Sequence, residues 1–188
     1  MKSNVLKLLG FVALIWAIEV LNSFMGHRLS AWGIRPRTEI GLIGIPLSPI
    51  LHGSFNHVVS NTIPFLVLGG LVALKGRQKF LGVSLFIIVV GGAGVWVLGR
   101  TAIHVGASGL VFGYFGYLVA NGWFDRRPLS ILAAIAVVLL YGGLVFGVLP
   151  TQGFVSWEAH LFGLIAGVVS AWLTRRRPSP AAPDSSGA

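Results

Sequence analysis

The chain alternates between long apolar segments and short polar ones, and the apolar segments have the length of membrane-spanning helices. A helix needs about 20 apolar residues to cross the hydrocarbon core of a bilayer. Six segments of roughly this length can be delimited, at 5–24, 57–74, 80–98, 107–124, 130–149 and 157–174. The pattern therefore predicts an all-α polytopic membrane protein with six transmembrane helices.

The two ends of the chain bound the predicted domain. Lys2 and Lys7 precede the first apolar segment, as in a secretory signal peptide. That segment has no clear small-x-small cleavage site and carries Trp16 and Glu19, so we expect it to be a true span. Residues 175–188 are rich in Arg, Pro, Ser and Ala, a composition typical of disorder. We expect one six-span domain over 1–174 and a disordered cytoplasmic tail over 175–188.

The basic residues between the spans predict the orientation. Cytoplasmic loops carry an excess of Lys and Arg. With a cytoplasmic N-terminus, ten basic residues fall inside and only four outside, these four being Arg28, Arg35, Arg37 and Arg100. Both termini are then cytoplasmic and the longest loop, about 25–56, lies on the outer side. Its Trp and Pro residues, separated by apolar stretches, favour a position partly within the membrane interface.

The composition supports assignment to the membrane proteins and argues against a nucleic-acid partner. Hydrophobic residues make up 55% of the chain and charged residues 10%, with a mean hydropathy of +0.84, whereas soluble domains carry about 25% charged residues. The net charge is +9, but the cations lie in short clusters between spans, so we expect no nucleic-acid partner. The chain has no cysteine, which excludes disulfides, thiolate nucleophiles and Cys-ligated metals.

Four polar side chains inside the spans share one depth. Polar groups within a membrane are costly and mark functional sites by default. Counted at 1.5 Å per residue from the cytoplasmic end of each span, His57 lies about 27 Å up and Asn61 about 21 Å up. Ser108 lies about 25 Å up its own span and His160 about 22 Å up. Three helices are therefore expected to present polar side chains to one layer in the outer part of the bilayer.

Glycines follow the polar residues on two of these helices. They recur at steps of three or four residues, as Gly109, Gly113 and Gly116 in the fourth span and Gly163 and Gly167 in the sixth. Faces of small residues let helix backbones approach closely. If the two faces meet, Ser108 and His160 come within reach of each other at the same height.

The same residues supply the parts of an acyl-transfer site. A neutral imidazole can take the proton of a serine hydroxyl, so Ser108 would be a nucleophile and His160 its base. The backbone N–H of Ser108 at a helix N-terminus would face incoming negative charge. His57 and Asn61 lie one turn apart and can donate hydrogen bonds to an oxyanion. Glu158 points away from His160 by helix phase, which predicts a two-residue dyad.

Three short motifs, in this order, resemble those of rhomboid intramembrane serine proteases. They are His52…His57-x-x-x-Asn61 as H-x4-H-x3-N, Gly106-Ala107-Ser108-Gly109 as GxSG, and Ala159-His160-x-x-Gly163-x-x-x-Gly167 as AHxxGxxxG. The motifs fall on spans two, four and six, and the resemblance covers about residues 1–174. It implies a six-transmembrane-helix rhomboid-like bundle and a serine endopeptidase that cleaves transmembrane segments of other membrane proteins.

The resemblance also implies a role for each matched residue. Ser108 would be the nucleophile, His160 the base, and His57 with Asn61 the oxyanion side. His52 would have a more structural role. Supporting positions are Gly106, Gly109, Phe112, Gly163 and Gly167. The resemblance further implies that the first outer loop lies partly in the outer leaflet and that water reaches the site from outside.

Two positions depart from the family pattern. Many members carry a Trp-Arg pair in the first outer loop, whereas residues 41–45 hold none. Four residues past the serine, members often have a tyrosine that stacks on the histidine. This chain has Phe112 there, which keeps the ring and loses the hydroxyl.

Each polar residue taken alone also has a structural interpretation. Ser108 could cap a helix beside a packing face, and the other three could be hydrogen-bonding links between helices. His27 and His104 fall in predicted outer loops, where we expect both to be solvated. Glu19 has no partner that the sequence identifies, and a structural role fits it better than a catalytic one.

Other protease classes lack their motifs here. A zinc intramembrane protease needs H-E-x-x-H, and an aspartyl type needs two acids inside spans, where only Glu19 lies well within one. The remaining alternative is a catalytically inactive rhomboid-like protein that binds membrane helices. We expect no metal and no cofactor. The expected partners are transmembrane protein substrates and the lipid bilayer, with a bacterial plasma membrane as the location and the oligomeric state left open.

Overall fold

The computed structural model describes residues 2–150 and 155–175, and the regular elements within these ranges are all helices. In chain order they are α1 (Lys2–Phe24), η1 (Arg28–Trp32), α2 (Glu39–Leu47), η2 (Ser48–Ile50), α3 (Phe55–Ala73), α4 (Arg77–Phe86), η3 (Ile87–Gly91), α5 (Gly92–Leu98), α6 (Ser108–Asp125), α7 (Pro128–Tyr141), η4 (Gly142–Val148) and α8 (Trp157–Leu173). One isolated antiparallel bridge joins Ile34 to His104. The all-α prediction is confirmed for this part of the chain, and from residue 176 the predicted disordered tail lies outside it.

Each of the six predicted spans coincides with a helix or a continuous helical run. Among the described residues, four of these are long and apolar enough to cross a membrane: α1, α3, the run α4–η3–α5 and the run α7–η4. The helix α8 is apolar but has only 17 residues. The helix α6 is outside this group, so the count of six transmembrane helices stays a prediction.

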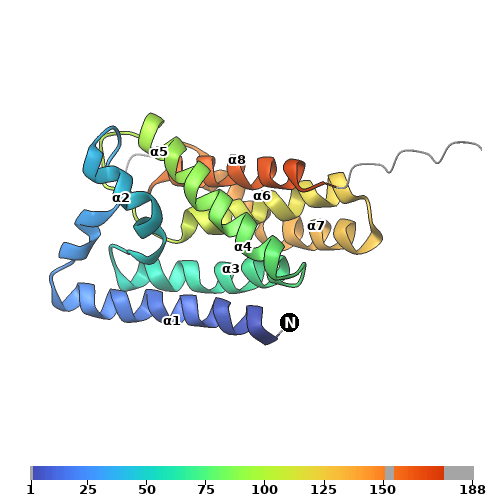
Figure 1. Cartoon of the computed structure of the whole chain (residues 1–188), viewed down its shortest axis with the longest axis horizontal. Helices are drawn as coiled ribbons and strands as arrows, with labels where there is room; N and C mark the ends of the chain where they lie inside the picture. Colours follow the sequence, from blue (N-terminus) through green and yellow to red (C-terminus); the bar gives the residue numbers. More distant parts are fainter. Residues whose placement is uncertain (1, 151–154, 176–188) are drawn as a thin grey trace, which may run out of the picture.

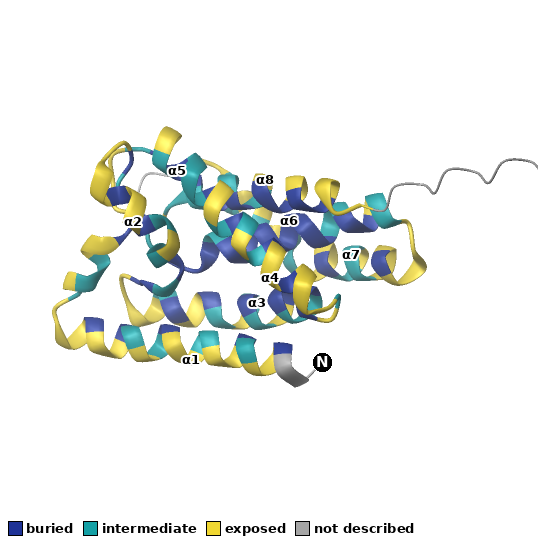
Figure 2. Cartoon of the chain, in the orientation of Figure 1, coloured by how far each residue is buried: buried dark blue, intermediate teal, exposed yellow. Residues whose placement is uncertain are grey.

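The helix α6 is the centre of the bundle, which explains its lower hydropathy. It is packed among α3, α7 and α8, and Figure 1 shows it enclosed between its neighbours. Of its 18 residues, 12 are buried, and the dark blue positions of Figure 2 gather on it and on the faces turned toward it. A helix surrounded by protein instead of lipid does not need a continuous apolar surface.

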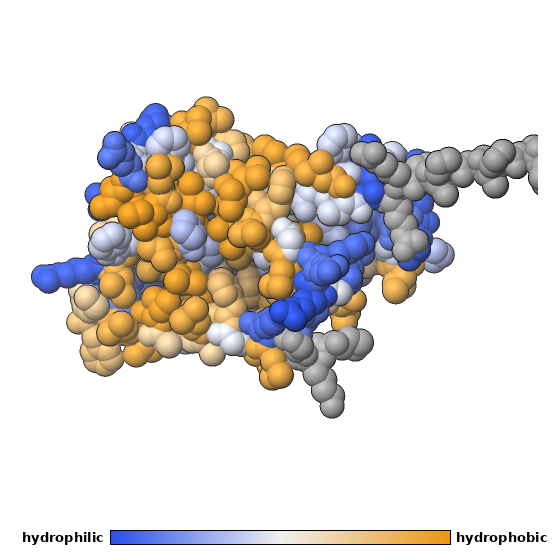
Figure 3. Space-filling model, in the orientation of Figure 1, coloured by the Kyte–Doolittle hydropathy of each residue, from blue (hydrophilic) through white to orange (hydrophobic). Residues whose placement is uncertain are grey.

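The outward faces of the bundle are apolar. Large exposed side chains such as Leu6, Phe24, Leu139 and Leu140 point away from the core. In Figure 3 apolar residues cover most of the visible face, and hydrophilic residues gather toward its two ends. This arrangement inverts that of a soluble protein and fits a surface whose solvent is lipid.

The segment 25–54 is structured and is hydrogen-bonded to α5 and to the residue that follows it. The Arg37 backbone N–H donates to the Trp96 carbonyl (2.9 Å), and its guanidinium Nη1 donates to the Gly99 carbonyl (2.8 Å). In return, Trp96 Nε1 donates to the Thr38 carbonyl at 2.8 Å. The residues 41–45 lack a Trp-Arg pair, and Arg37 together with Trp96 anchors this segment instead.

Candidate functional site

The turn before α6 places Ser108 at the first position of that helix. Gly106 has a φ of +120°, a conformation that residues with a Cβ rarely adopt. A Cβ there would lie 2.6 Å from His57 Cε1, so the turn needs glycine on two grounds. The Gly106 N–H donates to the Ser48 carbonyl at 2.8 Å. Ser108 is 7% exposed, and within the described ranges its hydroxyl makes no hydrogen bond.

The second candidate, His160, sits in the first turns of α8 in a defined tautomer. Its Nδ1 lies 2.9 Å from the Gly147 carbonyl oxygen. A carbonyl only accepts, so Nδ1–H is the donor and Nε2 of the neutral ring carries a free lone pair. The ring stacks on Phe112 with centroids 4.0 Å apart and planes at 6°. The stacking that we expected of Phe112 is therefore present without the phenolic hydroxyl.

The glycine faces of α6 and α8 meet, as the spacing predicts. A Cβ on Gly163 would strike the Gly109 carbonyl, and one on Gly167 would strike the Gly113 carbonyl. A Cβ built on Gly109 would lie 4.0 Å from Ala159 Cβ. Because these two residues directly neighbour Ser108 and His160 in sequence, the nucleophile and base candidates lie at adjacent points of the paired helices.

No hydrogen bond joins the Ser108 hydroxyl to the His160 ring among the described residues. Hydrogen bonds of this kind are often long in unliganded sites and tighten when substrate binds. The structure thus places the two helices together but leaves the dyad contact unmade.

The residues expected on the oxyanion side gather at the Gly106 turn. His52 Nε2 accepts from Asn61 Nδ2 (3.2 Å) and from the Ala107 backbone N–H (3.3 Å). The His57 ring packs edge-on against His52, with centroids 4.9 Å apart. Both His57 and Asn61 flank Gly106, two residues before Ser108. The H-x4-H-x3-N spacing therefore converges on the turn that carries the serine.

The His52 ring is held neutral by its surroundings. It is 0% exposed and lies before the start of α3, outside the spanning helices. Burial, and to a smaller extent the nearby His57, lowers the pKa of His52 from 6.5 to about 3. A neutral ring is what allows Nε2 to accept from Asn61 and from Ala107.

This burial predicts a loss of stability in acid. Below pH 6.5 the unfolded chain binds a proton at His52 that the folded chain takes up only near pH 3. The free energy of unfolding should therefore fall as pH decreases across this window, by up to about 1.4 kcal/mol per pH unit. Unfolding in detergent micelles at a series of pH values measures the slope. In His52→Gln the slope should be smaller, and an unchanged slope would show that His52 is not its source.

The structure corrects one expectation about polar loop residues and supplies partners for Glu19. His104 was expected to be solvated, but it is 2% exposed, because its loop pairs with Ile34 and packs against the start of α8. Glu19, which had no identified partner, is contacted by Asn22 Nδ2 at 3.4 Å and by His27 Nδ1 at 3.7 Å. The His27 side chain is 39% exposed. Of the two histidines expected to be solvated, His27 is therefore partly exposed and His104 is buried.

Sequence reasoning also missed the Gly147 carbonyl and the partners of Glu158. Among the described residues Glu158 makes no hydrogen bond to His160, and its Oε1 lies 3.4 Å from Arg100 Nε. Nothing in the spacing of Gly147 marks it, because its contribution is a main-chain oxygen that any residue carries. Within the described part of the chain, no three His, Asp or Glu side chains gather in a way that could hold a metal ion.

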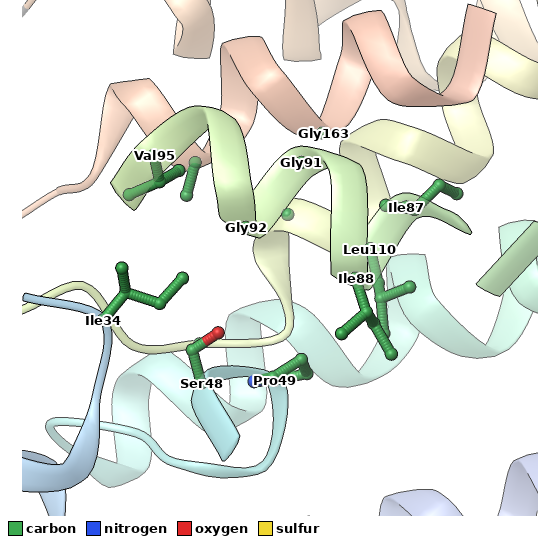
Figure 4. A pocket seen from close by; sticks show the side chains of 13 residues that line it. Ile34, Ser48, Pro49, Ile87, Ile88, Gly91, Gly92, Val95, Leu110 and Gly163 are labelled. Atoms are coloured by element: carbon green, nitrogen blue, oxygen red, sulfur yellow. The ribbon is translucent and has the colours of Figure 1, made fainter. Parts of the chain in front are cut away.

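A cavity of about 40 Å³ (Figure 4) is lined in part by Gly106 and Gly109, the glycines on either side of Ala107 and Ser108. Its lining comes from η2, η3, α5, α6 and α8 and includes Ser48, Val95, Leu110 and Gly163. Such a volume has room for a few water molecules at most, at about 10–15 Å³ each. A large substrate side chain would enter it only if the surrounding helices moved.

Known proteins similar to this chain include proteins that carry the rhomboid name. A family model described as the Rhomboid domain matches residues 41–177. An uncharacterised protein of Mycobacterium tuberculosis is 40% identical over 175 residues, which are 88% of this chain and 73% of that protein. Rhomboid-like protein 11 of Arabidopsis thaliana, a chloroplast protein, is 36% identical over 144 residues, 68% of this chain and 51% of its own length. A Bacillus subtilis protein described as a candidate rhomboid protease is 31% identical over 132 residues, 68% of this chain and 65% of its own length.

Proposed function

This chain belongs to the rhomboid family of integral membrane proteins, and from that premise we propose that it is an intramembrane serine endopeptidase. Its substrates are transmembrane segments of other membrane proteins. The observation that carries the proposal is the contact of α6 with α8 along their glycine faces. It brings the ends of these helices together at Ser108 and His160, with the His160 Nε2 lone pair free.

In the proposed reaction, His160 Nε2 takes the proton of the Ser108 hydroxyl as Oγ attacks the scissile carbonyl carbon. The Gly147 carbonyl accepts from Nδ1–H, which keeps the ring in the tautomer needed and stabilises the imidazolium that forms. The Phe112 ring face adds to this stabilisation, since aromatic faces attract cations. Nε2–H then protonates the leaving amine, and water hydrolyses the acyl-enzyme.

The negative charge of the tetrahedral intermediate falls on the oxyanion side. The Ser108 N–H is the first of α6 and has no acceptor within its own helix. We assign it to the oxyanion together with the side chains of His57 and Asn61. Such donors, fixed before the reaction, are worth more in a site shielded from water than in solution.

We place this chemistry in a domain over 1–174 with six spans, both termini cytoplasmic and the site toward the outer side of a bacterial plasma membrane. A substrate helix must unwind locally before cleavage, because its carbonyls are hydrogen-bonded within the helix. Segments with Gly or Pro would unwind at the least cost.

The alternative is a rhomboid-like protein that binds membrane helices without cleaving them. Both Ser108 and His160 are present, and inactive relatives typically lose one of them, so we favour the protease.

Incubation of the purified protein with a labelled single-span substrate in liposomes tests the proposal. Cleavage within the membrane segment is the expected outcome. Stoichiometric binding of the substrate with no product, and no labelling of the protein by a fluorophosphonate probe, would instead favour the helix-binding alternative.

Asn61→Ala should weaken catalysis through the oxyanion. Loss of one oxyanion donor typically lowers kcat about 10²- to 10³-fold, and this variant also removes a donor to His52 Nε2. The matched control is Thr62→Ala, at the position next to Asn61 in α3. This variant removes the hydrogen bond that Thr62 Oγ1 accepts from Trp16 Nε1 at 3.2 Å. Steady-state cleavage kinetics should show a large loss of kcat for Asn61→Ala alone. Equal activities of the two variants would remove Asn61 from the oxyanion side.

A further inference from the structure

A partly buried polar junction lies where the loop before α6 meets the start of α8. We use "the junction" for Arg100, His104, Ser156 and Glu158. His104 is 2% exposed and Glu158 1% exposed. The catalytic scheme above uses none of the four. The Arg100 side chain is 34% exposed. Burying two polar side chains is costly unless they are hydrogen-bonded, so the contacts that His104 and Glu158 make decide what their burial costs.

The ring of His104 connects the loop to the N-cap of α8. Its Nε2 lies 3.1 Å from the Arg100 carbonyl, and its Nδ1 lies 2.6 Å from Ser156 Oγ. Because the carbonyl can only accept, Nε2 carries the proton and Nδ1 accepts from the Ser156 hydroxyl. Ser156 Oγ in turn accepts from the Ala159 backbone N–H at 3.3 Å, which caps α8.

An ion pair reinforces the same contact. Arg100 Nε lies 3.4 Å from Glu158 Oε1, and the Arg100 backbone N–H donates to that oxygen at 3.2 Å. Arg100 Nη2 also donates to the Val155 carbonyl at 2.7 Å. The loop thus contacts both the residues before α8 and the acid in its first turn.

The main chain of His104 fixes the other side of the loop. Its N–H donates to the Ile34 carbonyl (2.9 Å), and its carbonyl accepts from the Ile34 N–H (3.0 Å). Four residues after His104 the chain reaches Ser108, and four residues after Ser156 it reaches His160. The junction therefore joins the two segments that deliver the nucleophile and the base, at equal chain distance from each.

We propose that His104 is a positioning residue that, through its hydrogen bond to Ser156, sets the separation between Ser108 and His160. The inference rests on the proposed protease function for its kinetic consequence. Further along α6 and α8, glycine contacts hold the helices together. At their outer ends, the junction is what aligns the serine turn with the first turn of α8. A displacement of about 1 Å between reacting groups can lower a rate about 10²-fold.

Kinetics of His104 and Ser156 variants test the positioning. His104→Ala should lower kcat about 10- to 100-fold and leave KM within about twofold, because substrate binding does not involve this ring. His104→Asn, whose Oδ1 can replace Nδ1 as acceptor, should recover much of the loss. Ser156→Thr keeps the hydroxyl and should be active, whereas Ser156→Ala should resemble His104→Ala without emptying the space of a ring.

Ser84→Ala is the matched control for loss of one buried hydrogen bond to α6. It removes the contact of Ser84 Oγ with the Tyr114 hydroxyl (2.6 Å), far from the junction, and should leave kcat within about twofold. Equal kcat in His104→Ala and wild type, or losses in kcat and KM that track the unfolded fraction alone, would overturn the positioning role.

A cross-link measures the alignment without relying on activity. The natural chain has no cysteine, and Cβ atoms at positions 109 and 159 would be 4.0 Å apart, within the range of about 3.5–4.5 Å that a disulfide requires. Gly109→Cys combined with Ala159→Cys should therefore cross-link under mild oxidation.

Adding His104→Ala to this pair should slow cross-linking, and adding Ser84→Ala should not. An unchanged rate with His104→Ala would refute the inference even if the protein proved to be an active protease. A slowed rate in a protein that cleaves nothing would uphold the alignment while the proposed protease function failed.

Discussion

Ser108→Ala is expected to eliminate cleavage of a transmembrane substrate, with kcat lowered by about 10³-fold or more. Among the described residues, Ser108 is the hydroxyl-bearing residue that follows the turn at Gly106 at the start of α6, and His57 and Asn61 flank that turn. His160→Ala should cause a loss of similar size, since an unassisted serine hydroxyl is a poor nucleophile.

The losses of kcat caused by Ser108→Ala and His160→Ala should not be additive. Groups that act as one unit in catalysis show strongly non-additive losses, so the double variant should be no slower than either single one. Substrate cleavage and the rate of fluorophosphonate labelling measure the effect. The control is Ser60→Ala, an exposed serine whose hydroxyl donates only to the His57 carbonyl of its own helix at 2.9 Å.

Wild-type cleavage rates in Ser108→Ala would rule out the dyad, and so would persistent labelling of that variant. Additive losses in the double variant would indicate that Ser108 and His160 act in separate steps.

Gly167→Val should have the largest effect on stability. A Cβ at this position would overlap the Gly113 carbonyl of α6, which is main chain and cannot rotate away. The helices would have to separate, and overpacking of this kind typically costs about 1–3 kcal/mol, occasionally more. Gly163→Val should add a loss of activity, because the carbonyl that its Cβ would strike belongs to Gly109, next to Ser108.

Thermal or denaturant unfolding in detergent micelles measures the effect on stability. Gly82→Ala is the control, since a Cβ at Gly82 in α4 has nothing within 4 Å. It should be neutral or slightly stabilising, because alanine reduces the freedom of the unfolded chain at no steric cost. If Gly167→Val unfolded at the same midpoint as Gly82→Ala, the close approach of α6 and α8 would be wrong.

The helices and the faces they pair could be read from the sequence. Span length, the three- and four-residue steps of Gly109, Gly113, Gly163 and Gly167, and the one-turn spacing of His57 and Asn61 are local properties. A helix converts such spacing into position along its axis and around it, independently of what the rest of the chain does. For this reason the helices and the paired glycine faces seen in the structure agree with those predicted from the sequence.

The tertiary structure alone decided which groups complete the site. The acceptor for His160 Nδ1 is a main-chain oxygen at Gly147, and main-chain groups leave no mark on residue type. His104 lies in a short segment between spans that we expected to be a solvated loop, whereas in the structure it is hydrogen-bonded to Ile34 and Ser156 and buried. The sequence thus determined the helices, the glycine faces and the one-turn spacing of His57 and Asn61, because these follow from helix geometry. The partners of His160, His104 and Glu158 depended on where distant loops come to lie, which no local spacing encodes.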